Sequence, residues 1–251
     1  MKDFYRKYTW QVKLGIVLVC FSILIYAVKL TILQNTRDTL NYIFNSLGFL
    51  PISAFLVTII LNELLSIRAR KQRLEKINMV IETFYAEAGT ELLTYLSDCD
   101  PDLSTVRNRL VITGEWTDDD FSELGRYLSG YRFDIDPCKV DLNRVSGFLK
   151  ERRKFLLRLL ENPVLLEHQS FTETLRTVFH LTEELNRRKD TTQLPDSDLH
   201  HLKGDLTRVY RHLALQWVDY MHYLKANYPY LFSLAMRTNP FDQNASVIVT
   251  G

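Results

Sequence analysis

Residues 44–96 read FNSLGFLPISAFLVTIILNELLSIRARKQRLEKINMVIETFYAEAGTELLTYL. The first half is apolar over about 20 residues, which is enough for an α-helix to cross the hydrocarbon core of a bilayer. Neither Gly nor Pro marks its exit, and it runs into a basic and then amphipathic helix that has to stand in water. This arrangement predicts a membrane span that continues without a bend into the stalk of a soluble domain.

A second apolar run lies upstream, at about residues 14–33, behind a start rich in aromatic and basic residues. A cleaved signal peptide is the competing interpretation, but no pair of small residues resembling Ala-x-Ala follows the run. The polar joint from Gln34 to Tyr42 can do little more than reverse the chain. We therefore expect a two-helix transmembrane hairpin in residues 1–67, with spans at about 14–33 and 44–66 and a bend at Pro51.

Lys and Arg residues give the orientation of this hairpin. Four precede the first span, and the joint between the spans contains only Arg37. The five that follow the second span are Arg68, Arg70, Lys71, Arg73 and Lys76. The positive-inside rule then predicts a multi-pass protein of the inner (cytoplasmic) membrane with both termini in the cytoplasm. The same five residues favour contact with anionic headgroups of the lipid bilayer.

The rest of the chain predicts an all-α fold, with a cytosolic helical bundle over residues 68–238 and a tail over 239–251. Residues 68–97 form the stalk, whose apolar residues recur at steps of three and four from Leu74 to Leu92. Such a stripe packs either on later helices of the same chain or on other copies of it. Its aromatic residues widen it beyond a narrow seam, which favours packing within the chain.

Capping patterns predict where the later helices begin. Thr117 precedes three Asp residues and Asp141 opens a helix to about Leu160, while Ser170 and Glu173 form a capping box for a helix that reaches Arg188. A long helix is expected from Leu199 to Asn227.

Composition and motifs exclude several functions. The 31 basic and 30 acidic residues argue against a nucleic-acid binder, and the three Cys residues lie far apart, which is typical of structural thiols in a reducing compartment. Phosphate-binding loops, dinucleotide-binding loops, zinc-protease motifs and nucleophile elbows are absent from the sequence. These absences favour a non-enzymatic role without a cofactor.

Two groups of residues leave alternatives open. Glu173, His180 and Glu184 share one helical face, and the last long helix carries Asp219 and His222 on a face that also includes His201 and Asp205. Such faces could bind a divalent metal if they met, although their order differs from that of di-iron bundles. The alternative is a solvated face with exposed ion pairs.

The second group is a polar stripe of Ser22, Tyr26 and Lys29 on the first span. Polar residues in apolar helices often face protein or water, which would suit a pore. The nine-residue joint is too short for a re-entrant filter, and Lys29 lies close enough to the outer boundary to reach it.

The chain resembles a family of uncharacterised bacterial and archaeal proteins that have two transmembrane helices and a cytosolic helical domain. The segments that carry the resemblance are GFLPISAFLVTIILNELL, RLEKINMVIETFYAEAGTELL, LLENPVLLEHQSFTETLRTVFHLTEEL and HLKGDLTRVYRHLALQWVDYMHYLKANYPYLFSLAMRTNPF. The resemblance implies a prokaryotic inner-membrane protein and brings no functional residues with it.

Taken together, these features predict a membrane-tethered helical scaffold or sensor that binds a protein partner or other copies of itself as a homo-oligomer. One alternative is an oligomeric ion channel or transport accessory subunit. The other is a metal-binding helical-bundle enzyme.

Overall fold

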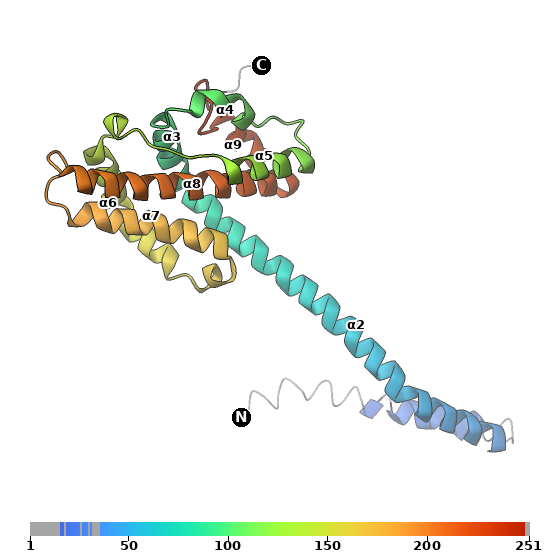
Figure 1. Ribbon diagram of the computed structural model, residues 1–251. Helices are drawn as coiled ribbons and strands as arrows, with labels where there is room; N and C mark the ends of the chain where they lie inside the picture. Colours follow the sequence, from blue (N-terminus) through green and yellow to red (C-terminus); the bar gives the residue numbers. More distant parts are fainter. Residues whose placement is uncertain (1–15, 18, 26, 30, 32–35, 249–251) are drawn as a thin grey trace. The chain divides into compact units, whose positions relative to one another are not determined.

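The computed structural model describes residues 16–17, 19–25, 27–29, 31 and 36–248. The chain divides into two compact units, Met1–Ala69 and Arg70–Gly251. All regular secondary structure in the described residues is helical. The predicted all-α class is therefore confirmed (Figure 1).

The first unit contains helical residues between 16 and 31 and the beginning of α2, which spans Thr36–Phe84 with Pro51 inside it. The polar joint was predicted to extend to Tyr42, which is wrong, because the residues from Thr36 onward already belong to α2. Asp38 lies in the first turn of α2, where the helix dipole favours a negative charge. Lys29 Nζ lies 5.2 Å from the ring centroid of Tyr42 in α2.

The predicted stalk is not one uninterrupted α-helix. After α2, the chain forms a π-helical turn, η1 (Tyr85–Gly89), and continues as α3 (Thr90–Asp98). The apolar stripe packs within the chain as expected, since its residues from Ile77 to Leu92 are buried in the core. Gly89 marks the π-turn, where a side chain would meet the rings of Phe84 and Tyr85. Sequence periodicity gave no sign of this insertion.

The remaining helices all lie in the second unit. They are α4 (Leu103–Leu110), α5 (Asp118–Gly130), the short η2 (Pro137–Lys139), α6 (Leu142–Leu160), the short η3 (Pro163–Glu167), α7 (Gln169–Arg187), α8 (Asp196–Asn227) and α9 (Pro229–Arg237). Thr117 and Asp120 form a reciprocal capping box at α5, and Asp141 caps α6. α8 starts three residues before its predicted start, directly after Pro195.

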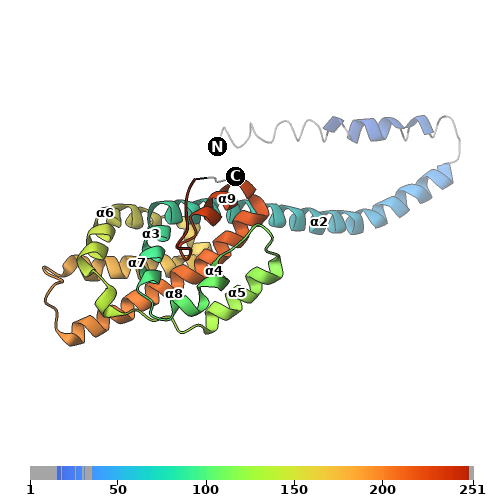
Figure 2. The same ribbon diagram turned by 90° about the horizontal axis from the view of Figure 1, so that it is seen from above.

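α8 is the central helix of the second unit. It packs against α3, α5, α7 and α9, and Figures 1 and 2 show it running through the middle of this unit. Its buried residues include Tyr210, Ala214, Val218 and Met221. A helix with neighbours on several sides is buried over most of its circumference, so few of its faces remain for solvent.

The predicted capping residue of α7 was wrong. His168, not Ser170, caps α7, and its Nδ1 accepts a hydrogen bond from the Phe171 backbone at 3.3 Å. Ser170 Oγ instead donates to Gln216 Oε1 of α8 at 3.1 Å. Ser170 therefore joins two helices, a use of its hydroxyl that the local pattern does not distinguish from a cap.

The segment predicted as a tail begins inside the core. Asn239 is buried and its Nδ2 donates to the backbone oxygen of Leu110 at 2.8 Å. Phe241 is also buried, with its ring edge against Trp217 at a centroid distance of 5.3 Å. Asn239 and Phe241 therefore hold the start of the segment in the core. Because each is held by its own separate contact, the segment shows no periodic apolar pattern in its sequence.

Candidate functional site

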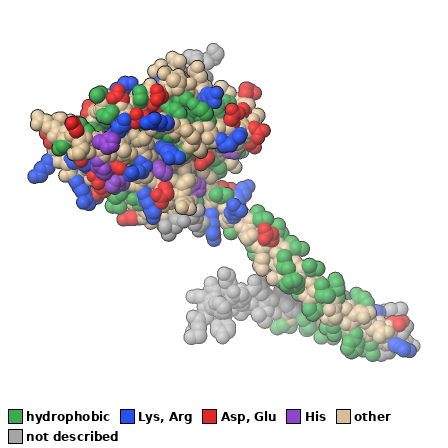
Figure 3. Space-filling model, viewed as in Figure 1, with side chains coloured by type: hydrophobic (Ala, Val, Ile, Leu, Met, Phe, Trp, Pro, Cys, Tyr) green, Lys and Arg blue, Asp and Glu red, His purple; other side chains and the backbone are tan. Residues whose placement is uncertain are grey.

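The long helices α7 and α8 bring two pairs of ionisable residues together. His180 and Glu184 lie one turn apart on α7, and His201 and Asp205 lie one turn apart on α8. Residues four positions apart occupy the same face of a helix, so each pair projects together. α7 and α8 pack against each other, and the two pairs face one another across this contact. Figure 3 shows histidine side chains among acidic and basic ones on the face over these helices.

Asp205 lies at the centre of this group, which we call the α7–α8 cluster (His180, Glu184, His201 and Asp205). Its side chain is only 4% exposed, and its Oδ2 lies 3.5 Å from His180 Nε2 and 3.4 Å from His201 Nε2. Glu184 lies further from the imidazoles, with Oε1 4.0 Å from His180 Nε2 and Oε2 3.8 Å from His201 Nε2. Four nitrogen and oxygen atoms thus converge beside one buried carboxylate.

Two arginines hold the carboxylates of the cluster. Arg208 Nη1 donates to Asp205 Oδ1 at 2.8 Å, and Arg188 Nη1 donates to Glu184 Oε2 at 2.8 Å. The hydrogen bond from Arg188 is the main reason that the pKa of Glu184 lies below its usual range. Asp205 Oδ2 has no hydrogen-bond partner. Burying a charged oxygen without a partner is costly, so this atom is the chemically unusual feature of the cluster.

The structure separates the residues that the sequence proposed as metal ligands. It brings His180 and Glu184 together, but Glu173 pairs instead with Arg176 at 3.1 Å. His222 Nε2 lies 2.8 Å from Asp118 Oδ1, and the His222 ring stacks on Phe121. Asp219 is exposed. These three belong to other surroundings and do not join the cluster.

Sequence reasoning undervalued Asp205 and His201. The sequence left open whether their helical face binds a metal or is solvated. Asp205 is buried because α7 covers that side of α8. A usable signal existed in the spacing. His-x-x-x-Glu ends one helix, His-x-x-x-Asp begins the next, and the short connection between them brings the two turns side by side.

The other predicted groups lie on the helices of the N-terminal half. Ser22 is exposed, Lys29 is half-buried against Tyr42, and Tyr26 lies outside the described residues. The basic group after the second predicted span is exposed along α2, and it consists of Arg68, Arg70, Lys71, Arg73 and Lys76.

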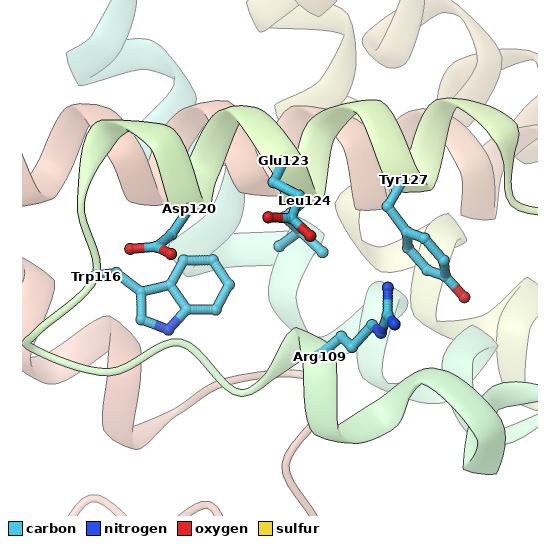
Figure 4. A pocket seen from close by; sticks show the side chains of 6 residues that line it. All are labelled: Arg109, Trp116, Asp120, Glu123, Leu124 and Tyr127. Carbon is cyan, nitrogen blue, oxygen red and sulfur yellow. The ribbon is translucent and has the colours of Figure 1, made fainter.

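An open pocket of about 200 Å³ lies elsewhere, between α4 and α5. Figure 4 shows Arg109 rising from α4 toward the ring of Tyr127, beside Glu123. The Arg109 guanidinium lies 4.9 Å from the Tyr127 ring centroid, and Asp120 on the pocket wall is engaged in the α5 cap. Arg109 and Asp120 therefore already have structural roles.

Comparison with known proteins gives two family matches. Residues 73–237 match the family described as "Uncharacterized protein MJ1433, C-terminal helical domain", and residues 5–65 match "MJ1433, N-terminal helical domain". "Uncharacterized protein MJ1433" of Methanocaldococcus jannaschii is 44% identical over 236 residues, which cover 94% of each chain. No solved structure matches the chain.

Proposed function

The chain belongs to the MJ1433 family of helical proteins, and on that premise we propose that it is an integral membrane protein whose N-terminal helices anchor a cytosolic helical domain. The domain then acts as a membrane-tethered scaffold or sensor that binds a protein partner or other copies of the chain. The family's division into an N-terminal and a C-terminal helical domain, at residues 5–65 and 73–237, is compatible with an anchor followed by a soluble body.

The exposed apolar surface of α2 carries the proposal. In the described part of the chain, one helical stretch is long and apolar enough to cross a membrane, with a mean hydropathy of 2.0 in its most apolar window and none of that window buried. The large apolar side chains between Phe44 and Ile67 are 49–72% exposed. Burial of each would be favourable by about 1.5–3 kcal/mol, so water is a poor environment for this surface and hydrocarbon a good one.

The length and flanks of this segment support the same assignment. Residues 44–66 make a helix of about 34 Å, close to the roughly 30 Å of a bilayer core. The exposed basic group that begins at Arg68 lies immediately beyond its end, where cytoplasmic charge is expected. Arg37 precedes it and would lie on the opposite side.

A labelling experiment tests both insertion and orientation. The full chain, with Cys20 and Cys138 replaced by Ser and the buried Cys99 retained, would carry either Arg37→Cys or Glu161→Cys. A membrane-impermeant maleimide should label the Arg37→Cys protein in intact cells and the Glu161→Cys protein only after lysis. Recovery of the full chain in solution without detergent, or labelling in the reverse order, would refute the proposal.

The interaction role needs a separate measurement, because an anchored domain without partners would pass the labelling test. Mass measurement of the full chain in nanodiscs, with chemical crosslinking in the native membrane, should show either defined oligomers or a repeatable crosslinked partner. A monomer that gives no crosslinked product would remove the scaffold role and leave the anchor intact.

A further inference from the structure

We propose that the α7–α8 cluster is a binding site for one divalent transition-metal ion, with Zn²⁺ as the best match. His180 Nε2, His201 Nε2, Asp205 Oδ2 and Glu184 Oε1 would be the four ligands. Imidazole nitrogen and carboxylate oxygen together suit Zn²⁺ and its neighbours in the first transition row. This site is independent of the membrane assignment.

The spacing of the ligand atoms supports a tetrahedral site. Zn–N and Zn–O bonds of about 2.0–2.2 Å place neighbouring ligand atoms of a tetrahedron about 3.3–3.5 Å apart. The distances from Asp205 Oδ2 to the two imidazole Nε2 atoms are 3.5 and 3.4 Å, within that range. These distances exceed those of ordinary hydrogen bonds, so Asp205 Oδ2 lies near both imidazoles without forming a hydrogen bond to either.

The fourth ligand and the histidines must move slightly to complete the site. In the described part of the chain, no three or more His, Cys, Asp or Glu side chains are already arranged to hold a metal ion. The separation of 4.0 Å between His180 Nε2 and Glu184 Oε1 has to shorten by about 0.6 Å to reach tetrahedral spacing. Because His180 and His201 are half-exposed, at 50% and 52%, their rings have room to rotate.

The buried carboxylate supplies the second, independent argument. The side chain of Asp205 is 96% buried, and Arg208 donates a hydrogen bond only to its Oδ1. Oδ2 is left without a hydrogen bond and points toward both imidazoles. A bound cation would complete the coordination of this atom, as ligating carboxylates in metal sites are held on one oxygen and bind with the other.

The arginines fit the role of outer partners. Arg188 binds Glu184 through Oε2 and leaves Oε1 for the metal, and Arg188 is itself held by Asp198. Both arginines also place positive charge near the ion, and this repulsion weakens the binding of the ion. The two carboxylate ligands balance the two charges of the metal, and the imidazoles bind as neutral groups.

The experiment uses the full chain purified in detergent without a metal-affinity resin. Equilibrium dialysis with Zn²⁺ should give one tightly bound ion per chain, and titration with Co²⁺ should give the visible absorption of a tetrahedral complex. His180→Ala and His201→Ala, at half-exposed positions that tolerate truncation, should each weaken Zn²⁺ binding by at least about tenfold. His222→Ala is the matched control, because His222 also touches a carboxylate, Asp118, but lies outside the cluster.

Absence of stoichiometric Zn²⁺ binding to the wild-type chain would overturn the proposal. Equal binding by the wild type and by a His180→Ala/His201→Ala double variant with an unchanged melting temperature would overturn it as well, since the ion would then lie elsewhere.

Discussion

Arg188 and Asp198 form a two-pronged ion pair that closes the connection between α7 and α8. Arg188 Nε donates to Asp198 Oδ2 at 2.9 Å, and Arg188 Nη2 donates to Asp198 Oδ1 at 2.6 Å. The side chains are 17% and 28% exposed, so solvent screens this pair less than an open surface pair. The same guanidinium binds Glu184, and one residue therefore fixes both the loop and a member of the α7–α8 cluster.

Replacement of Arg188 by Lys should lower the free energy of unfolding by about 1.5–3 kcal/mol, because an ammonium group cannot reproduce the paired geometry. Urea unfolding of the full chain in detergent, followed by the fluorescence of the buried Trp217, would measure the change. Arg187→Lys is the control, since Arg187 is 80% exposed and lies 3.8 Å from Glu183. Equal losses in the two variants would contradict the special role of Arg188.

The pair between Lys203 and Asp134 should be visible in the pH dependence of stability. The hydrogen bond from Lys203 holds the pKa of Asp134 below its usual range. A carboxyl group with a lowered folded-state pKa stabilises the fold fully above its unfolded pKa of about 3.9. That contribution disappears as the pH falls through the lower, folded-state pKa.

Lys203→Gln should therefore flatten the dependence of unfolding free energy on pH below about pH 4, relative to the wild type. The measurement is urea unfolding at a series of pH values. Lys189→Gln, at an exposed position in the loop after α7, should leave the pH profile unchanged. A parallel shift of the whole curve by Lys203→Gln, without a change of slope, would show that Asp134 does not titrate differently in the folded state.

Local patterns predicted much of the helical organisation because their causes are local. The α5 cap depends on Thr117 and Asp120, three positions apart, and the sequence displays both. The apolar stripe ending at Leu92 likewise follows from helical spacing. Where a single turn determines the structure, the sequence was sufficient.

The cluster was only half predictable because burial depends on distant neighbours. His180 and Glu184 were identified from their spacing on α7, but the position of Asp205 in the core depends on α7 covering α8. The cap at His168 was missed for the same kind of reason, since Gln216 on α8 takes the hydroxyl of Ser170. These outcomes depend on tertiary contacts that no local pattern records.

Zn²⁺ should raise the thermal stability of the helical domain if the α7–α8 cluster binds it. An ion that binds only the folded state contributes about 2.7 kcal/mol when its free concentration is 100 times the dissociation constant. We expect the melting temperature of the full chain to rise with Zn²⁺, to return on addition of a chelator, and to be insensitive to Mg²⁺, which prefers oxygen ligands. A rise that persists in His201→Ala would point to binding outside the cluster.

Two glycine substitutions should have opposite effects on stability. A Cβ atom at Gly89 would lie 2.8 Å from ring atoms of both Phe84 and Tyr85, and both rings are fully buried. They cannot retreat without disturbing the core, so Gly89→Ala should cost about 1–3 kcal/mol, as overpacking does. At Gly147, inside α6, a Cβ atom would meet nothing within 4 Å. Because Ala is the better helix former, Gly147→Ala should stabilise by up to about 1 kcal/mol. Urea unfolding of both variants gives the comparison, and a neutral Gly89→Ala would mean that the π-turn can relax around the added methyl group.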